Sequence, residues 1–419
     1  MRILHLVHQY MPEYVGGVEL YTRWLTHAQA QAGHQVSIFY RRSGEGNGVE
    51  PRTEEGVQVW AAWHGLVTPT RRFRATFGDP ALVPLFEQVL DTEQPEIVHV
   101  EHLMGHPTAL IDVLRRRHIP FVVTLWDFWW RCANAQLLTN YDQTVCPGPQ
   151  AHYLNCARCA LARAGKLGLS VMAPLFAPLM AWRNQRLLRA LRAAAALIAP
   201  TSFVKRWYAD HSAPRETLRV LLPGLERPPS LPSRQREKDN NVRFLYVGGL
   251  SYQKGIHALV EAFAGVRGAA ELWIAGDEMF DPAYVTQLRR LATPQIRFLG
   301  RLARSEVWQA LVDADVVVVP SLWYETFSFL VSEGFIAGKP VLASRLGPLA
   351  DRVRDGVDGL LLPPGDVVAW REAIQLLVDT PDELARLRQN VRAPLSLEEH
   401  GAALESLYRQ VIGASTSAC

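Results

Sequence analysis

Short apolar runs alternate with amphipathic, helix-forming stretches along this chain, and the alternation occurs in two separate series. A strand followed by a helix and then by a second strand forms a right-handed crossover between parallel neighbours. The first series therefore predicts an α/β fold with a doubly wound parallel sheet. Its predicted strands are residues 3–7, 36–40, 97–100, 121–125 and 197–200, and its predicted helices are residues 18–32, 110–117 and 185–196.

The second series begins after a segment rich in proline and serine, residues 227–234, which is typical of a linker. We predict two Rossmann-like domains that face each other across a cleft: an N-terminal domain over 1–222, a linker over 223–240 and a C-terminal domain over 241–397. A last helix at about 398–412 is expected to pack back on the N-terminal domain. The predicted strands of the second series are 242–247, 271–275, 296–299, 316–319 and 341–343, and its predicted helices include 257–266, 284–292, 305–313 and 382–389.

Length and charge restrict the class of protein and its partners. With 419 residues the chain is too long for one ordinary core, and 20% charged residues are typical of a globular protein. The net charge of +3 is small for this length, so no nucleic-acid partner is expected. The chain has no apolar stretch long enough to span a membrane, and its start lacks the pattern of a signal peptide. We therefore expect a cytoplasmic protein.

Glu325 and Glu333 are the most informative pair of side chains. The segment that holds them lies between the predicted strands 316–319 and 341–343, which indicates a strand, a loop, a helix and a strand. Glu325 is expected at the junction of loop and helix, and Glu333 about two turns into the helix. Ligands of open parallel sheets bind at the carboxyl ends of strands. Two acids around a helix N-terminus suit a ligand with hydroxyls and phosphate, although capping chemistry is the alternative for Glu325.

Two glycine-rich turns follow the first strand of each series. Gly16 and Gly17 precede the first helix, and Gly248 and Gly249 precede Lys254 and the next helix. Glycine permits a close approach of backbone to a ligand, and a lysine beside a strand end suits a diphosphate. The alternatives are ordinary glycine turns and a solvated lysine.

Several segments together resemble the family 4 glycosyltransferases of the GT-B fold, and the resemblance covers nearly the whole chain. It implies a retaining transfer of a sugar from a nucleoside-diphosphate-sugar donor to a hydroxyl acceptor, a glycan or a lipid-linked one. It also implies that catalysis requires no cofactor or metal, that the second domain binds the donor and that the first shapes the acceptor site. The segments are Gly16 and Gly17, residues 33–36, 247–255, 320–333, 337–341 and 355–359.

The resemblance also implies roles for individual residues. Glu333 is expected to bind the ribose hydroxyls and Glu325 the donor sugar, while Lys254 and the Gly17 amide neutralise the diphosphate. Glu325, Asp127 and Lys254 are the candidate catalytic residues. The other expected donor-site residues are Gly16, Gly248, Gly249, Leu299, Gly300, Leu302 and the backbone of Thr326, Phe327 and Ser328; the expected acceptor-side residues are Trp126, Asp127 and His102.

The sequence departs from the family pattern at positions that bear on the substrate. Gly249 stands where many members have an arginine, so Lys254 acts with one fewer cation or Arg301 substitutes. Trp126 stands where a histidine is common, which exchanges a polar contact with the sugar for a stacking surface. Thr326 and Ser328 stand where proline and glycine are common. A nucleotide-sugar hydrolase or epimerase and a non-catalytic sugar-nucleotide or glycan-binding protein therefore remain as alternatives.

Four of the five cysteines lie in one window: Cys132, Cys146, Cys156 and Cys159. Their spacing is consistent with a structural zinc site. Reduced buried thiols and disulfides are the alternatives, the latter least favoured in a cytosolic chain. Four thiolates leave no open position, so a catalytic metal is not expected.

The segment 167–182 is apolar and carries prolines at positions 174 and 178. One interpretation is a broken helix that packs on the first domain. The other is a peripheral contact with the inner face of a membrane, in which Arg183, Arg186 and Arg189 meet anionic lipid. In the second interpretation Trp129, Trp130 and Trp182 lie at the level of the headgroups.

Overall fold

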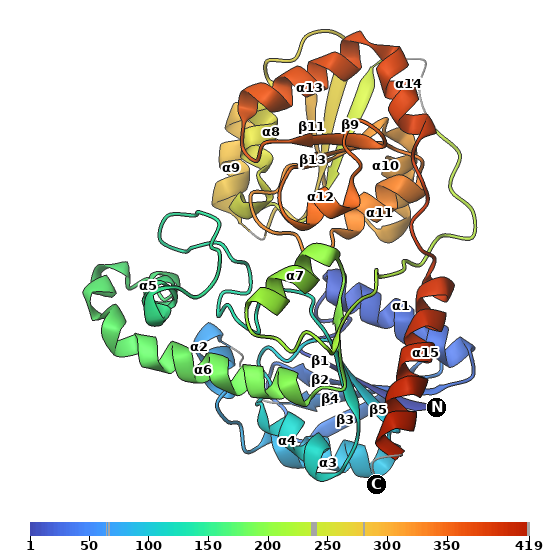
Figure 1. Ribbon diagram of the computed structural model, residues 1–419. Coiled ribbons are helices and arrows are strands. Elements are labelled where there is room, and N and C mark those ends of the chain that lie inside the picture. The colour runs from blue at the N-terminus through green and yellow to red at the C-terminus, as the bar shows by residue number, and fades with distance from the viewer. Residues whose placement is uncertain (64, 66–67, 236–240, 280, 417–419) are drawn as a thin grey trace. The chain divides into compact units, whose positions relative to one another are not determined.

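A computed structural model describes residues 1–63, 65, 68–235, 241–279 and 281–416 of the protein (Figure 1). The chain forms two compact units: unit 1 is Met1–Glu226 with Leu395–Cys419, and unit 2 is Arg227–Pro394. Residues 236–240 of the predicted linker and Cys419 lie outside the described residues. Within the described ranges, no helix combines the length and the apolar composition needed to cross a lipid bilayer.

Unit 1 contains an eight-stranded sheet in the order β3-β4-β2-β1-β5-β6-β7-β8. All neighbours are parallel except β3 and β4, which form an antiparallel hairpin at the edge. The strands are β1 (Arg2–Val7), β2 (Gln35–Arg42), β3 (Val49–Glu54), β4 (Val57–Trp63), β5 (Ile97–Val100), β6 (Phe121–Thr124), β7 (Ala196–Ala199) and β8 (Leu218–Val220).

Helices cover both faces of this sheet (Figure 1). Adjacent residues of β2 point to opposite faces: Ile38 and Tyr40 share a core cluster with Val18 and Ala30 of α1, whereas Phe39 contacts Phe86 of α3. This alternation makes the sheet doubly wound. The helices are α1 (Gly17–Gln31), α2 (Pro69–Ala75), α3 (Leu82–Glu93), α4 (Ala109–Arg116), α5 (Leu154–Arg163), α6 (Ala173–Ala193), α7 (Ser202–Asp210) and α15 (Leu397–Thr416), with 3₁₀ turns at Ala151–Tyr153 and Leu167–Met172.

The last helix, α15, packs against α1 in unit 1. The Tyr408 hydroxyl lies 2.6 Å from Nδ1 of His99 on β5, and the Tyr21 hydroxyl of α1 lies 2.5 Å from Nε2 of His400. All four side chains are buried. Burial lowers the pKa of His99 and of His400 to about 4, so both rings are neutral at pH 7 and serve as hydrogen-bonding groups.

Unit 2 contains a six-stranded, wholly parallel sheet in the order β11-β10-β9-β12-β13-β14. Its strands are β9 (Val242–Val247), β10 (Ala270–Ala275), β11 (Ile296–Gly300), β12 (Val316–Val319), β13 (Val341–Ser344) and β14 (Gly359–Leu362). Its helices are α8 (Ile256–Phe263), α9 (Pro282–Leu291), α10 (Arg304–Asp313), α11 (Phe329–Ile336), α12 (Pro348–Arg352), α13 (Val367–Asp379) and α14 (Pro381–Gln389), with a 3₁₀ turn at Tyr252–Lys254.

The two faces of this second sheet are also both covered. Val316 and Val318 belong to one buried cluster, with side chains of α8, α9, α13 and α14. Val317 and Val319 belong to another, with side chains of α10, α11 and α12. Buried on both sides, β12 consists of four consecutive valines, as expected for a central parallel strand. The predicted α/β fold with two doubly wound domains is confirmed.

Two predictions about local structure need correction, and some elements were not predicted. Helix α11 begins at Phe329, so Glu333 is its fifth residue and lies little more than one turn in. The apolar segment is not broken at Pro178, because α6 runs through this residue from Ala173. The hairpin β3–β4, the helices α3 and α13 and the strand β14 have no counterpart among the predicted elements.

The proposed set of membrane-facing side chains is also wrong in part. Trp129 and Trp130 are buried, and Arg183 is buried with its guanidinium 4.8 Å from the centre of the Trp129 ring. Arg186 donates to the Thr108 hydroxyl at 3.0 Å. Trp182 is exposed, although its ring stacks on Phe77. These side chains hold α6 against the rest of unit 1.

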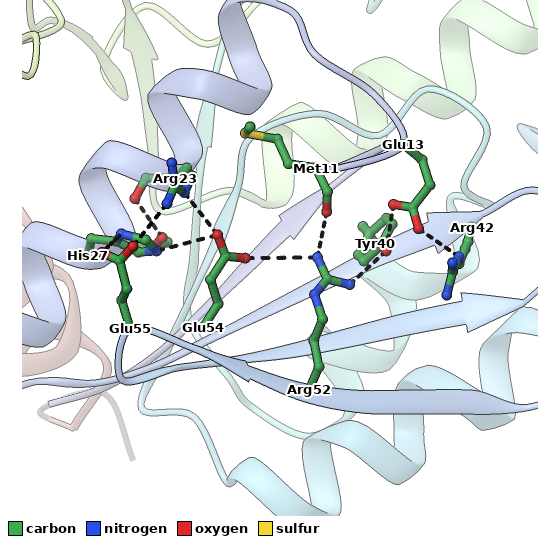
Figure 2. Close-up of polar contacts among 10 residues, drawn as sticks. Met11, Glu13, Arg23, His27, Tyr40, Arg42, Arg52, Glu54 and Glu55 are labelled. Carbon is green, nitrogen blue, oxygen red and sulfur yellow. Dashed lines mark hydrogen bonds and ion pairs between the residues drawn. The ribbon is translucent and has the colours of Figure 1, made fainter. Parts of the chain in front are cut away.

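Polar contacts tie the edge hairpin to the loop that follows β1 (Figure 2). Arg52 of β3 donates to the Met11 carbonyl at 2.5 Å and to the Tyr40 hydroxyl at 2.9 Å. Glu13 accepts from Tyr40 at 3.2 Å and pairs with Arg42 at 2.8 Å. The loop that leads to Gly16 and Gly17 is therefore fixed at Met11 and Glu13.

Candidate active site

In unit 2, two loops at the carboxyl ends of neighbouring strands bring Lys254 and Glu325 together. The chain leaves β9, passes Gly248 and Gly249 and reaches Lys254 in a 3₁₀ turn. It leaves β12 at Val319 and reaches Glu325 in the next loop. The Lys254 ammonium lies 2.6 Å from Oε1 of Glu325. Two residues far apart in sequence thus share one site, where a doubly wound sheet binds its ligand.

Gly255 explains why these two loops can lie so close. Its φ of +71° is in the left-handed region, and a Cβ atom there would lie 2.0 Å from the Pro320 carbonyl oxygen. A backbone hydrogen bond of 2.8 Å from Leu322 to the Gln253 carbonyl joins the loops beside it. Only glycine fits this crossing point. The position of Lys254 is therefore set by backbone contacts as well as by its ion pair.

Three donors share one oxygen of Glu325. Besides Lys254, the Ser321 hydroxyl donates at 2.8 Å and the Trp323 indole at 3.0 Å. Burial by itself would raise the pKa of Glu325, but the charge of Lys254 and these hydrogen bonds hold the pKa below its usual value of 4.5. Glu325 is therefore a carboxylate at neutral pH, fixed in orientation. The contributions of Ser321 and Trp323 were not predicted from the sequence.

Glu333 has a cationic partner that the sequence analysis missed. Its Oε1 atom lies 2.5 Å from the Arg304 guanidinium, which also lies over the Trp308 ring at 4.8 Å. Arg304 begins α10, and Glu333 lies on α11, 29 residues further along. The sequence does not indicate a contact between two residues that lie this far apart in the chain. The ion pair orients the carboxylate and engages one of its oxygens.

The turn before α11 has a strained backbone. Ser328, the residue before the helix, adopts φ +60° and ψ +90°. Among the residues that the structure describes, no carbonyl accepts from the backbone N–H groups of Phe327 or Ser328. These groups and the start of α11 offer donors to an anion or to a sugar oxygen. Thr326, half-buried, lies in the same turn.

Arg352 supports this turn from beneath and is a second residue that the sequence analysis missed. It is half-buried in α12, donates to the Phe327 carbonyl at 2.9 Å and to the Ser332 hydroxyl at 2.5 Å, and lies 3.7 Å from the centre of the Phe327 ring. Burial of the guanidinium lowers the pKa of Arg352 to about 9. Phe327 is buried. The side chain of Phe327 is thus a packing group, whereas its backbone faces the turn.

The remaining predicted donor-site residues lie at the same edge of the sheet. Gly249 has open space where a Cβ atom would stand, and its carbonyl accepts from the Tyr246 hydroxyl at 2.9 Å. Leu299 and Gly300 end β11, and Leu302 packs partly on the core beside α10. Arg301, offered as a substitute cation, is 65% exposed and lies 3.9 Å from Asp277. Its observed partner is therefore this carboxylate.

In unit 1, His8 and His102 link the start of α1, which follows the first loop, to Asp127 on the predicted acceptor side. Gly16 caps α1, and Glu19 in the first turn lies 3.6 Å from Nε2 of His8. The His8 ring lies 4.5 Å from the ring of His102, whose Nε2 is 2.9 Å from Asp127. Burial raises the pKa of Glu19 and lowers that of His8 well below its usual value. Gly17 is the first residue of α1.

The hydrogen bonds around His102 assign its tautomer. The backbone N–H of Met104 donates to Nδ1 at 3.0 Å, which leaves the proton on Nε2, facing Oδ2 of Asp127. The other carboxylate oxygen of Asp127 accepts from the Trp129 backbone at 2.8 Å. Asp127 is 26% exposed, so it can be reached from solvent, whereas His102 is buried and positions it.

Trp126 does not form the predicted stacking surface. It is 5% exposed, its indole N–H donates to the buried carboxylate of Glu101 at 2.8 Å, and its ring packs on Tyr21 at 4.5 Å. Glu101 also lies 3.0 Å from His5. Trp126 therefore donates a hydrogen bond to a buried carboxylate. The prediction of a stacking surface was wrong because the residues next to Trp126 in sequence do not reveal its contact with Glu101.

The four clustered cysteines are free thiols and lie in unit 1, in the segment after β6 and in α5. The Asn140 side chain donates to Sγ of Cys159 at 3.2 Å, and the Gly148 backbone donates to Sγ of Cys146 at 3.4 Å. Burial raises the pKa of Cys132 to about 11, and burial together with the neighbouring thiols raises that of Cys156 to about 12. N–H groups directed at sulfur favour a thiolate or a metal-bound sulfur.

The spacing of these thiols is wider than in a closed metal site. Among the described residues, only one group of three potential metal ligands has its ligand atoms within 4.8 Å of one another. This group is His5, His99 and Glu101, and it contains no cysteine. That group is buried and its members already have hydrogen-bond partners, because His5 pairs with Glu101 and His99 pairs with Thr124. Tetrahedral Zn–S bonds of 2.3 Å place sulfur atoms roughly 3.8 Å apart. The residue types fit zinc, and the thiols would have to move closer to bind it.

Comparisons with known proteins agree with this geometry. Residues 241–380 match the family model described as "Glycosyl transferases group 1", and residues 16–224 match the "Glycosyl transferase 4-like domain". The glycogen synthase of Mycobacterium tuberculosis is 25% identical over 94% of this chain and 90% of its own length. The D-rhamnosyltransferase WbpZ of Pseudomonas aeruginosa is 30% identical over 53% of this chain and 58% of its own length.

Solved structures show the same fold. The sucrose-phosphate synthase from Thermosynechococcus elongatus superposes with a TM-score of 0.69 at 20% identity and covers 99% of this chain and 100% of its own. Anabaena Alr3699/HepE, in complex with UDP and glucose, gives a TM-score of 0.64 at 17% identity and covers 100% of both chains. The two family models together span most of the chain, and the curated relatives are glycosyl-transferring enzymes. The protein is therefore a glycosyltransferase of the family 4 type with the GT-B fold.

Proposed function

We propose that the protein is a retaining enzyme that moves a sugar from a nucleoside-diphosphate-sugar donor to a hydroxyl group of an acceptor, in glycan, polysaccharide or glycolipid synthesis on the cytoplasmic side of a membrane. The observation that carries this proposal is the contact of 2.6 Å between Lys254 and Glu325 at the strand ends of unit 2. In this proposal the cation stabilises the departing diphosphate, and the carboxylate beside it binds the sugar.

The diphosphate acquires negative charge as it leaves, and unit 2 offers groups that stabilise this charge. Lys254 supplies a positive charge, and the N–H groups of Phe327 and Ser328 with the start of α11 supply hydrogen-bond donors. In unit 1, the N-terminal amides of α1 at Gly16 and Gly17 are proposed to add to them. These groups support a reaction that needs no catalytic metal ion.

The two glutamates have separate roles in this proposal. Glu333, held by Arg304 through one oxygen, accepts from the ribose hydroxyls with the other. Leu299, Gly300 and Leu302 contact the base. Glu325 accepts from the hydroxyls of the donor sugar while Lys254 turns to the phosphate. Both are acceptors for hydroxyl groups, because both are oriented carboxylates.

The proposed route is a front-face displacement. The bond between the anomeric carbon and the phosphate oxygen breaks, the acceptor oxygen forms its bond to that carbon on the same face, and the acceptor proton passes to the departing phosphate. Asp127 hydrogen-bonds the acceptor, and His102 holds Asp127 through its Nε2–H at 2.9 Å. Removal of the Asp127 carboxylate should therefore raise the KM for the acceptor and lower kcat.

A thermal-shift panel of UDP, GDP, dTDP, ADP and CMP tests the donor site. A bound nucleotide raises the unfolding midpoint by mass action. Because the HepE structures contain UDP and UDP-glucose, we expect UDP to give the largest shift. Glu333→Ala should abolish the shift, whereas Glu325→Ala should preserve it and reduce turnover. If no nucleotide shifts the midpoint at about millimolar concentration, the donor site is wrongly assigned.

Turnover with and without acceptor separates transfer from the alternatives. A hydrolase or epimerase consumes the nucleotide sugar in the absence of an acceptor, and a binding protein does not consume it at all. We expect consumption only with a hydroxyl acceptor, and NMR of the product should show the anomeric configuration of the donor. An inverted product would contradict the proposed front-face route.

We also propose that Cys132, Cys146, Cys156 and Cys159 hold a structural zinc ion. The N–H groups directed at Cys146 and Cys159 and the presence of four free thiols in one part of unit 1 support this assignment. The zinc would complete the segment after β6, which carries Asp127 and Cys132, without taking part in the reaction.

A further inference from the structure

An unusual concentration of exposed apolar side chains lies in unit 1. Six of the seventeen large apolar side chains that are exposed in the described residues fall within residues 167–176. Within this group of six, the two most exposed are Val171 at 84% and Leu175 at 71%. We call these six the apolar tip: Leu167, Leu169, Val171, Met172, Leu175 and Phe176. Such a cluster is a common mark of an interaction surface.

The packing of α5 and α6 explains why the tip is exposed. On α6, Ala173, Ala177 and Met180 recur at helical spacing and pack with Ala157 and Leu161 of α5. This face of α6 therefore packs against α5. Leu175 lies on the opposite face, whereas Phe176 borders the packed face and is less exposed. In Figure 1 the chain turns from α5 into α6 at an end that projects from the rest of unit 1.

The segment around the apolar tip carries basic residues and no acidic ones. From residue 143 to residue 209 the sequence has no aspartate or glutamate and nine lysines and arginines, whereas the whole chain has 44 basic and 41 acidic residues. Arg183 is buried and Arg186 is held by Thr108, but Lys166, Arg189 and Arg192 are exposed. Lys166 therefore adjoins the tip, and Arg189 and Arg192 lie further along α6, in a part of the sequence that has no acidic residue.

We propose that the apolar tip inserts into the interfacial region of a membrane that contains anionic lipids, with Lys166, Arg189 and Arg192 against the headgroups. Aliphatic side chains with high exposure gain from burial among acyl chains, and the cations gain from a negative surface potential. A nucleic acid would match the cations but leave Val171 and Leu175 in water. The proposal is independent of the donor chemistry in unit 2 and places the enzyme where a lipid-linked acceptor lies.

The test is flotation of the full chain with vesicles of pure phosphatidylcholine or of phosphatidylcholine with about one third phosphatidylglycerol. We expect binding to the anionic vesicles at roughly 0.1 M salt and loss of binding at roughly 1 M salt. Val171→Asp with Leu175→Asp should reduce binding about tenfold or more. The matched control is Val368→Asp with Leu376→Asp, two exposed apolar residues of α13 in unit 2, which should bind like the wild type.

A second pair of variants tests the charges. Lys166→Glu with Arg189→Glu and Arg192→Glu should reduce binding about tenfold, whereas Arg115→Glu with Arg116→Glu and Arg290→Glu, exposed residues of α4 and α9, should not. An unchanged unfolding midpoint shows that each variant is folded. Absence of vesicle binding by the wild type, equal binding to both vesicle types, or equal loss in target and control variants would overturn the proposal. Binding of RNA without binding of vesicles would also overturn it.

Discussion

The ammonium group of Lys254 lies 2.6 Å from the carboxylate of Glu325 and joins the loop after β9 to the loop after β12. Both side chains are largely buried, with 25% and 11% of their surfaces exposed. A donor diphosphate that contacts Lys254 would compete with Glu325 for the same cation. Binding of the donor and orientation of Glu325 are therefore coupled through one contact, so substitution of either residue should alter both.

Lys254→Met should destabilise the protein in a pH-dependent manner. Removal of the cation leaves Glu325 as a buried charge without its partner, which costs about 3 kcal/mol at pH 7. The pKa of Glu325 is held below 4.5 in the folded protein, so its ionised form contributes stability above pH 4.5. This contribution is lost as the pH falls through the folded pKa. Urea unfolding should therefore show a large difference between variant and wild type at pH 7 and a small one near pH 4.

The matched control for this prediction is Arg289→Met, which removes the exposed partner of Glu278. It should cost less than about 1 kcal/mol. Adding Glu325→Gln to Lys254→Met should recover part of the lost stability at pH 7. A loss that is equal at both pH values would show that the charge of Glu325 is not its cause.

Arg304→Met should weaken nucleotide binding without abolishing it. The ion pair of 2.5 Å keeps Glu333 in one orientation, and its loss should raise the Kd for UDP about tenfold. Titration calorimetry measures the change. Arg297→Met, which removes the exposed partner of Glu271, is the matched control and should leave the Kd unchanged. An unchanged Kd in Arg304→Met would mean that Glu333 does not need its partner, or does not bind the ribose.

The strands of the core could be predicted from the sequence because their signals are local. The predicted strands 242–247, 316–319 and 97–100 coincide with β9, β12 and β5, each a mostly apolar segment between turn residues. The hairpin β3–β4 was missed because β3 contains charged residues and a proline and lies exposed at the sheet edge. Its position is fixed by contacts such as that of Arg52 with the Met11 carbonyl, which connect distant parts of the sequence.

In the candidate site, too, some residues could be predicted from local sequence and others could not. Lys254, Glu325 and Glu333 stand in recognisable segments, whereas Arg304 and Arg352 meet their partners across 29 and 20 residues. Only the packing of α10, α11 and α12 brings these side chains together. The stacking surface expected at Trp126 failed for a related reason, since Glu101, which accepts from its indole, lies on another loop 25 residues earlier.

Gly249 and Gly255 should respond in opposite ways to substitution, although they lie in one loop. Gly249→Ala fits open space and should change stability little, whereas Gly255→Ala places Cβ 2.0 Å from the Pro320 oxygen at a positive φ and should cost at least about 3 kcal/mol. Urea unfolding measures both. Gly249→Arg supplies the cation common in relatives and should tighten UDP binding about tenfold. Weaker binding would show that the diphosphate does not approach Gly249.

The purified protein should contain one zinc ion per chain, measured by elemental analysis after purification without chelator. Cys156→Ser should remove it and lower the unfolding midpoint, because the four thiols would no longer form a closed site. Cys419→Ser changes the cysteine outside the cluster and should keep the metal. A metal-free wild type that does not bind added zinc would show that the thiols are reduced packing groups.

Ser328→Gly should stabilise unit 2 and test the shape of the turn before α11. Ser328 adopts φ +60°, which costs a residue with a Cβ atom roughly 1 kcal/mol relative to glycine. The substitution should therefore raise the free energy of unfolding by about that amount and leave the Kd for UDP unchanged, since the backbone N–H groups remain. Ser332→Gly, inside α11, is the control and should destabilise, because it removes the acceptor of Arg352 and a side chain from a helix. Destabilisation by Ser328→Gly would mean that the serine hydroxyl makes a contact worth more than the backbone strain.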